Sequence, residues 1–129
     1  MRLLLDSHCL VWFRNGDERL SPVVRMAIES EDVGLVVSIA SFWELGLKES
    51  LGRFKVEAGV AGLYREWIQN GVADLLSIEF RHLDGLGSLP WLHRDPFDRL
   101  LIAQAMIEDL TLATADELIR SYPGLKAIW

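Results

Sequence analysis

The chain has 129 residues, which is the usual length of one domain, and half of them are hydrophobic, which excludes intrinsic disorder. The formal net charge of −6 excludes a basic nucleic-acid clamp that holds its ligand by charge alone. The single cysteine, Cys9, excludes an internal disulfide and a multi-thiolate metal site. Because Asp6 interrupts the first apolar run, we expect no signal peptide or membrane-spanning helix there, and we predict one cytoplasmic domain over residues 1–129.

The first half of the chain alternates between two hydrophobic patterns. Short runs of apolar residues are typical of strands buried on both faces, and apolar residues spaced three and four apart are typical of helices. These patterns predict a strand at Leu3–Leu5, a helix that starts at Ser21-Pro22, a strand at Gly34–Val37, a helix from Ser38 or Ser41 to Gly52, and a helix at Val56–Asn70.

The second half continues the alternation. It predicts a strand at Val72–Ile78, a short helix at Glu79–Leu86, a loop at Gly85–Pro96, a core helix at Phe97–Glu108, a strand at Leu110–Thr114, a helical turn at Asp116–Arg120 and a last strand at Leu125–Ile128. Strands that alternate with helices form parallel sheets covered on both faces. We therefore predict an α/β fold: a three-layer α/β/α domain with a central, mostly parallel sheet of four to five strands.

Four acidic residues fall where predicted strands end or helices begin. Asp6 closes the first strand and Asp116 follows the strand Leu110–Thr114, while Glu44 and Asp98 lie in the first turns of two helices. In an open parallel sheet these junctions meet at one edge, where ligands bind. Several ionised carboxylates so close together require a cation, and Mg²⁺ or Mn²⁺ suits oxygen ligands. Such sites are suited to phosphodiester hydrolysis.

Each acid alone also has a purely structural explanation. The segment from Ser41 to Glu44 fits a capping box. Asp95 before Pro96 fits a helix N-cap, with Asp98 at the third helical position. Asp116 and Asp6 could likewise cap the helices that follow them. The coincidence on one edge favours a metal site, most clearly for Asp6, because an acid that ends an apolar strand is costly to bury without a partner.

The segments that carry the four acids follow in a characteristic order: Leu4-Leu5-Asp6-Ser7-His8, Ser38-Ile-Ala-Ser-Phe-Trp-Glu44, His93-Arg-Asp-Pro-Phe-Asp98-Arg-Leu-Leu-Ile-Ala-Gln-Ala105 and Leu112-Ala-Thr-Ala-Asp116. Together, and over essentially the whole chain, they resemble the PIN-domain ribonucleases, and closely the VapC-type toxins of bacterial toxin–antitoxin pairs. The resemblance implies a PIN-like domain, a Mg²⁺-dependent endoribonuclease that cuts RNA, self-association as a homodimer or a larger complex, and inhibition by a cognate antitoxin.

The resemblance places the four family acids on Asp6, Glu44, Asp98 and Asp116. It implies that Asp6 and Asp98 bind the metal directly, and that Glu44 and Asp116 complete the shell and help to orient the attacking water. We assign no role to His8, His82 or His93, because a lone histidine is more often structural. We read Asp95 as the N-cap.

Basic and aromatic residues outside these motifs carry two further expectations. The basic side chains available to contact RNA phosphates are Arg14, Arg19, Lys48, Arg53, Arg94 and Arg99. With so acidic a chain, we expect RNA binding to be weak and sensitive to salt. Four aromatic residues either line a groove for an antitoxin or a second copy of the chain, or simply pack in the core: Trp12, Phe13, Trp43 and Trp67.

Two other classes of function remain open from the sequence. The same acids would serve a metal-dependent phosphatase or another nuclease, although Asp6-Ser7-His8 lacks the second acid of a nucleophilic-aspartate phosphatase. A catalytically inactive PIN-like module that binds a protein partner would use the acids only as helix caps.

Overall fold

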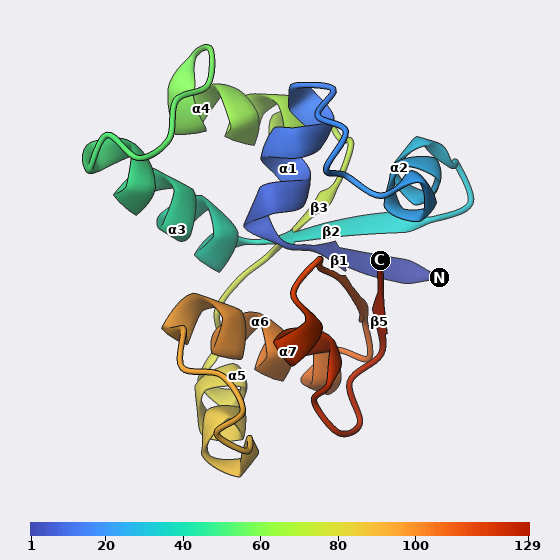
Figure 1. The fold of residues 1–129 in the computed structure, drawn as a ribbon, viewed down its shortest axis with the longest axis vertical. Helices are drawn as coiled ribbons and strands as arrows, with labels where there is room; N and C mark the ends of the chain where they lie inside the picture. The colour runs from blue at the N-terminus through green and yellow to red at the C-terminus, as the bar shows by residue number, and fades with distance from the viewer.

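The computed structural model describes all residues 1–129 and contains one five-stranded sheet (Figure 1). Its strands are β1 (Arg2–Leu5), β2 (Gly34–Ser38), β3 (Asp74–Leu76), β4 (Thr111–Ala113) and β5 (Ala127–Ile128). They lie in the order β3-β2-β1-β4-β5, and all four neighbouring pairs are parallel. The predicted parallel sheet of four to five strands is confirmed.

Helices cover both faces of this sheet, as the three-layer prediction requires (Figure 1). On one side lie α1 (Ser7–Arg14), α2 (Pro22–Glu29), α3 (Ile39–Ser50), α4 (Gly59–Tyr64) and the π-helical turn η1 (Arg65–Gln69). On the other side lie α5 (Phe80–Gly85), the 3₁₀ turn η2 (Leu86–Ser88), α6 (Pro96–Ile107) and α7 (Glu117–Arg120). None of the helices is both long enough and apolar enough to span a membrane.

Alternating side chains of the strands divide the core in two. In β1, Leu3 and Leu5 belong to the cluster under α1, α2 and α3, whereas Leu4 belongs to the cluster under α6. Strand β2 repeats the pattern, with Val36 on the side of Leu4. Because both faces are buried, a strand needs apolar residues at every position, and this explains the unbroken apolar runs of the sequence. Cys9 packs in the first cluster as a small buried residue.

The start of α3 differs from one prediction. Ser38 is the N-cap, and its Oγ accepts a hydrogen bond from the backbone N–H of Ala40 at 3.1 Å. The helix therefore begins at Ile39, and Glu44 lies in its second turn rather than its first. The capping box from Ser41 to Glu44 is wrong, because Ser38 already leaves β2 in the extended conformation that an N-cap requires.

Two other elements are shorter than predicted. The helix expected at Val56–Asn70 begins at Gly59, because Ala58 has a left-handed backbone with a φ of 64°, and it continues through η1. The strand expected at Val72–Ile78 is reduced to the edge strand β3. The remaining predicted boundaries move by only one or two residues. Two elements have no counterpart among the predicted ranges: α1 follows β1 with only Asp6 between them, and the turn η2 lies inside the stretch expected to be a loop.

Candidate active site

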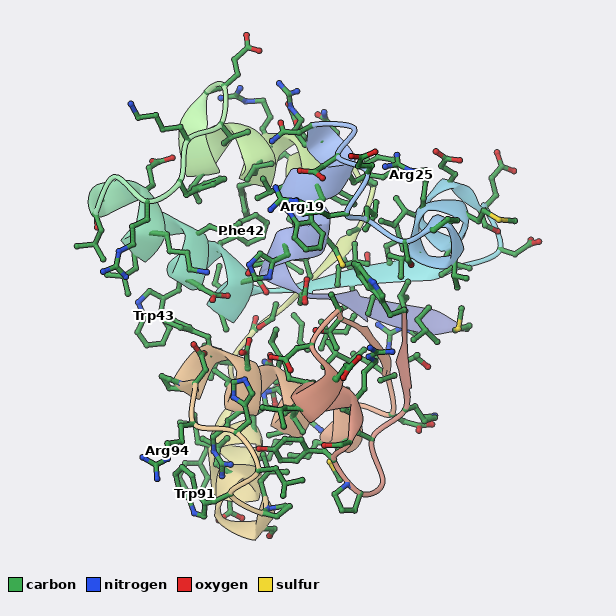
Figure 2. All side chains as sticks on the ribbon, viewed as in Figure 1. Arg19, Arg25, Phe42, Trp43, Trp91 and Arg94 are labelled. Carbon is green, nitrogen blue, oxygen red and sulfur yellow. The ribbon has the colours of Figure 1, made fainter.

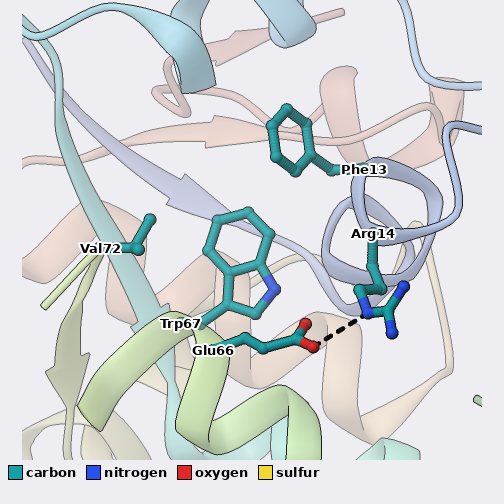
Figure 3. A pocket seen from close by; sticks show the side chains of 5 residues that line it. All are labelled: Phe13, Arg14, Glu66, Trp67 and Val72. Atoms are coloured by element: carbon teal, nitrogen blue, oxygen red, sulfur yellow. Dashed lines mark hydrogen bonds and ion pairs between the residues drawn. The ribbon is translucent and has the colours of Figure 1, made fainter. Parts of the chain in front are cut away.

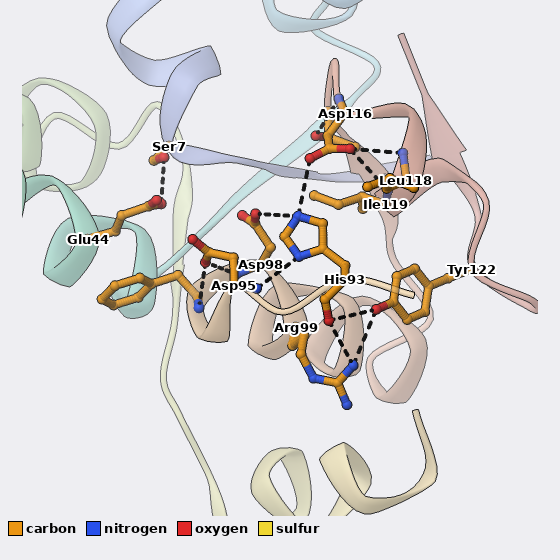
Figure 4. A network of polar contacts seen from close by, with 12 residues as sticks. Ser7, Glu44, His93, Asp95, Asp98, Arg99, Asp116, Leu118, Ile119 and Tyr122 are labelled. Carbon is orange, nitrogen blue, oxygen red and sulfur yellow. Dashed lines mark hydrogen bonds and ion pairs between the residues drawn. The ribbon is translucent and has the colours of Figure 1, made fainter. Parts of the chain in front are cut away.

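The carboxyl ends of β1, β2 and β4 share one edge of the sheet, and the predicted acids gather there. Asp6 directly follows β1, Asp116 lies three residues after β4, and Glu44 points in from α3. Asp98 enters from the opposite face of the sheet, in the first turn of α6 (Figure 4). A pocket of about 250 Å³ is lined by Asp6, Asp98 and Asp116, together with His8, Trp12 and Thr114.

Asp6 is a buried acid that also caps a helix. Its carboxylate accepts a hydrogen bond from the backbone N–H of Cys9 at 3.0 Å, so the capping interpretation holds for one of its oxygens. The residue is only 7% exposed, and burial raises its pKa although the hydrogen bond from Cys9 opposes the shift. No basic side chain lies within ion-pair distance of it. Capping therefore leaves most of the cost of this buried charge uncompensated.

Glu44 is held from two sides. Ser7 donates a hydrogen bond through its Oγ to Oε1 at 2.7 Å, and the Lys48 ammonium lies 3.1 Å from Oε2. Ser7 is the first residue of α1 and immediately follows Asp6, so this hydrogen bond joins α1 to α3 beside Asp6. The buried Glu44 therefore serves no capping function and is fixed in orientation toward the sheet edge.

Asp98 is strongly perturbed by its surroundings, including its acidic neighbours. The neighbouring Asp95 is the true N-cap of α6, since its Oδ1 accepts hydrogen bonds from the backbone N–H groups of Phe97 at 2.9 Å and Asp98 at 3.1 Å. The prediction that Asp95 is the cap is confirmed, and the Asp98 side chain is left free of that role. Burial, followed by repulsion from other carboxylates, raises the pKa of Asp98 to about 8. The repelling groups are, in decreasing order, Asp95, Glu44, Asp6 and Asp116.

The two carboxylate oxygens of Asp116 have different partners. Its Oδ1 caps the short helix α7 by accepting from the backbone N–H of Leu118 at 2.8 Å. Its Oδ2 lies 3.3 Å from Nε2 of His93. Thr114 holds the backbone of Asp116 in place, because its Oγ1 accepts a hydrogen bond from the backbone N–H of Asp116 at 3.2 Å.

His93 is the site residue that sequence reasoning missed. Its Nε2 lies 3.2 Å from Oδ2 of Asp98 and 3.3 Å from Oδ2 of Asp116 (Figure 4). The backbone N–H of Asp95 donates to its Nδ1 at 3.1 Å, so Nδ1 is an acceptor and the proton sits on Nε2. His93 thus bridges the two carboxylates. The available signal was its position five residues before Asp98, at the end of the loop that leads into α6.

Two overlapping groups of side chains have ligand atoms close enough to share an ion. In each of them the ligand atoms lie within 4.8 Å of one another: His93, Asp98 and Asp116 form one group, and Glu44, Asp95 and Asp98 form the other. Asp98 belongs to both. Asp6 belongs to neither, although it lines the same pocket and its charge acts on Asp98.

The donor set fits a hard divalent cation. Five carboxylates gather at this edge, and Lys48 is the only lysine or arginine within ion-pair distance of any of them. Carboxylate oxygens are the ligands that Mg²⁺ and Mn²⁺ prefer, and a cation here would relieve the repulsion that raises the Asp98 pKa.

The predicted aromatic set does not line one groove. Trp67 is buried in the core, and Phe13 packs edge-on against it at 5.6 Å between ring centroids. Both line a separate pocket beside the ion pair between Arg14 and Glu66 (Figure 3). Trp12 instead lines the acidic pocket. Trp43 is 61% exposed (Figure 2), and its ring packs edge-on against Phe97. Core packing therefore accounts for Trp67 and not for Trp43.

The predicted basic set also divides. Arg14, Arg19 and Lys48 are engaged in ion pairs, and Arg99 is buried. Arg53 and Arg94 make no ion pair.

Fold and site together define an α/β protein with an acidic centre at the carboxyl edge of a parallel sheet. The family model described as "PIN domain" matches residues 3–125, so the chain belongs to the PIN-domain family. The predicted resemblance to PIN-domain proteins is thus confirmed. No curated protein sequence matches the chain significantly.

Three solved structures share this fold along nearly the whole chain. VapBC2 from Rickettsia felis, bound to a promoter DNA fragment, has a TM-score of 0.73 at 14% identity, with 100% of this chain and 99% of that chain covered. DNA-bound VapBC from Salmonella typhimurium has a TM-score of 0.67 at 16% identity, with 99% and 97% covered. A toxin–antitoxin complex from Klebsiella pneumoniae has a TM-score of 0.65 at 15% identity, with 98% and 96% covered.

Proposed function

We propose that this protein is a metal-dependent endoribonuclease of the VapC type and the toxin of a toxin–antitoxin pair. The observation that carries the proposal is the unbalanced cluster of carboxylates around Asp98, whose pKa is raised to about 8 by burial and by its acidic neighbours. A stable fold gains nothing from such crowding, and a site that binds a divalent cation requires it. Membership in the PIN-domain family supports the nuclease assignment.

Asp98, Asp116 and Asp6 are the residues that would hold Mg²⁺ or Mn²⁺, with Glu44 completing the site. A bound divalent cation supplies a Lewis acid for the phosphoryl oxygens and makes hydroxide available near neutral pH. Glu44 is held by Ser7 and Lys48, so its carboxylate is already oriented to position the attacking water. His93 acts as a positioning residue, because its Nε2–H holds Asp98 and Asp116 in a fixed relation.

The proposed partners are an RNA substrate, a cognate antitoxin and a second copy of the chain. The support is the fold shared with VapBC complexes, in which a chain of this shape is found with its antitoxin. A cytoplasmic location belongs to the same proposal, since an RNA-cutting toxin acts where RNA is translated.

The direct test is cleavage of single-stranded RNA by the purified protein. We expect cleavage with Mg²⁺ or Mn²⁺, none with a chelator, and cleavage about 10³-fold slower by Asp6→Asn or Asp98→Asn. The matched control is Asp32→Asn, which removes an exposed carboxylate from the turn before β2, at the opposite edge of the sheet. Equal cleavage by the parent and the two site variants would refute the assignment of these residues.

The same preparation separates the two alternatives. Hydrolysis of a simple phosphate monoester in preference to RNA would favour a phosphatase, and cleavage of DNA in preference to RNA would favour another nuclease. A folded protein that binds the cation and hydrolyses none of these substrates would favour an inactive binding module.

A further inference from the structure

A further pocket, formed by η2, the loop before α6 and the start of α6, has the opposite charge to the acidic pocket. It measures about 360 Å³ and is lined by Trp91, Arg94 and Arg99, together with Leu86, Gly87 and Pro96. No acidic residue lines it. In a chain of net charge −6, a pocket whose only charged residues are two arginines points to an anionic ligand.

Arg99 supplies this pocket with a buried positive charge. The residue is 5% exposed and has no carboxylate partner. Its guanidinium instead donates to the carbonyl oxygens of Leu89, Pro90 and His93 and to the hydroxyl of Tyr122. Its charge is therefore spread over neutral acceptors and is not cancelled by an acid.

Trp91 forms an aromatic platform above that charge. The Cζ atom of Arg99 lies 3.8 Å from the centroid of the indole, so the guanidinium covers one face of the ring. The Trp91 residue is nevertheless 77% exposed, which leaves the rest of the ring open to solvent beside Arg94 (Figure 2). Packing does not account for so large an exposed aromatic residue, and a flat ring with a fixed orientation is what a nucleobase stacks on.

One loop connects this pocket to the acidic site. Trp91 and Arg94 flank His93, whose ring bridges Asp98 and Asp116 while its carbonyl accepts from Arg99. Trp91 and Arg94 are exposed, whereas the His93 side chain is largely buried against the acids. A ligand that occupies the pocket would therefore lie next to the proposed site of phosphodiester cleavage.

We propose that the pocket formed by Trp91, Arg94 and Arg99 binds one nucleotide of the single-stranded RNA substrate, away from the bond that is cut. The base stacks on the free face of Trp91, and the adjoining phosphate contacts Arg94. This inference rests on the proposed ribonuclease function. The pocket offsets the acidic net charge locally, and it favours unpaired RNA because a base in a duplex has no free face to stack.

Binding to the pocket is tested separately from cleavage. A labelled oligoadenylate is titrated into the protein in a chelator, which prevents cleavage, and adenosine monophosphate is titrated while the Trp91 indole N–H is followed by NMR. We expect Trp91→Ala to weaken oligoadenylate binding by about tenfold, within the range for loss of one stacked base. Trp91→Phe should retain most of the affinity. Leu92→Ala, which removes the adjacent exposed apolar side chain, should have no effect.

Arg94 is tested through the salt dependence. Arg94→Ala should weaken binding and reduce the slope of log affinity against log salt by about 0.7, the value for one phosphate contact on a single strand. The control is Arg2→Ala, an exposed arginine at the amino end of β1. Equal slopes for the parent and both variants would contradict a phosphate contact at Arg94.

Steady-state cleavage kinetics then separate the proposed nucleotide pocket from the proposed ribonuclease function. If the parent cuts RNA, Trp91→Ala should raise KM by about tenfold with little change in kcat, because the pocket binds substrate and transition state alike. A parent that cuts RNA while Trp91→Ala leaves both KM and binding unchanged would overturn the pocket and preserve the ribonuclease. RNA binding that depends on Trp91, in a protein that cuts nothing, would preserve the pocket and overturn the ribonuclease. If an acidic peptide binds at Trp91 and RNA does not, the ligand of the pocket is a protein partner, and the proposal of an RNA nucleotide is overturned.

Discussion

At each end of helix α6 a histidine from another segment contacts acidic residues, and the two ends differ in charge balance: His82 of α5 lies at the carboxyl end, and His93 of the preceding loop lies at the amino end. At the carboxyl end, buried His82 accepts the backbone N–H of Glu79 through Nδ1 and lies 2.9 Å from Glu108 through Nε2. At the amino end, His93 is engaged in the same way, with Nδ1 on a backbone N–H and Nε2 toward carboxylates. The two histidines thus share a tautomer and differ in their surroundings.

The negative charge of Glu108 is balanced, because Arg81 also forms an ion pair with it. Asp98 and Asp116 share His93 alone, and three further carboxylates lie around them. The arrangement around Glu108 joins α5 to the end of α6 and requires no further cation. The arrangement around Asp98 and Asp116 retains an excess of negative charge that costs stability, and such an excess is characteristic of a site built for a ligand. Charge balance, more than the presence of a histidine–acid contact, therefore distinguishes the functional end of α6 from the structural one.

The largest effect is expected from removing the charge of Asp98. Asp98→Asn keeps the shape of the side chain and removes the carboxylate shared by both groups of potential ligands. RNA cleavage should fall by about 10³-fold, which corresponds to about 4 kcal/mol of activation free energy. The companion variant Glu108→Gln, at the balanced end of α6, should cut RNA at the parent rate. Equal losses in both variants would show that the two ends of α6 do not differ in function.

The next effect is on stability as pH changes. The folded pKa of Asp98 is about 8 against an ordinary value of 3.8, so the folded protein holds a proton that the unfolded chain releases. Stability is therefore greatest below the ordinary pKa, and it falls by several kcal/mol as pH rises from the ordinary pKa to the folded one. The raised pKa of Asp6 acts in the same direction.

Urea unfolding in a chelator at several pH values measures this loss. The decline should be much smaller in Asp98→Asn, and added Mn²⁺ should restore the parent at pH about 8, the folded pKa. An unchanged decline in Asp98→Asn would mean that other groups are responsible for it.

A smaller effect is expected at the balanced end of α6. His82→Ala leaves a buried cavity and removes the acceptor for the backbone N–H of Glu79. The free energy of unfolding should fall by about 2–4 kcal/mol, while the RNA cleavage rate per folded molecule stays the same. Chemical unfolding and activity, measured on one preparation, check both statements. A change in metal affinity would contradict the purely structural role given to His82.

The smallest effect is expected from Arg81, which is half exposed and shares its charge between Glu79 and Glu108. Arg81→Met should lower the thermal midpoint far less than His82→Ala does, because solvent screens exposed ion pairs. Thermal unfolding of both variants in low and high salt measures the difference. A loss as large as that of His82→Ala would place the main stabilising contact on Arg81 instead.

The sequence predicts the sheet because each buried strand is an uninterrupted apolar run, as Leu3–Leu5 illustrates. It also predicts where the acids gather, since the carboxyl ends of parallel strands must meet. It fails where local signals compete. Ser38 and Ser41 both suit an N-cap, and only the end of β2 decides between them. The left-handed backbone at Ala58 has no signal in the residue itself.

His93 and Arg99 show a second kind of limit. A histidine in a loop has no periodic pattern, and its role depends on contacts with Asp116, which is 23 residues away in the chain. Arginine usually lies at the surface, yet Arg99 is buried. Its partners include backbone carbonyl groups, which a sequence does not specify. The sequence thus locates the charged residues, whereas the fold decides which of them are neutralised.

Anomalous diffraction from crystals grown with Mn²⁺ tests the central claim most directly. We expect an anomalous peak at the edge of the sheet, within about 2.2 Å of a carboxylate oxygen of Asp98, with Asp6 or Asp116 as a further ligand, and we expect no peak there in Asp98→Asn. A parent crystal without a peak at this edge, with His93 still bridging Asp98 and Asp116, would contradict the claim that these carboxylates are gathered to bind a cation.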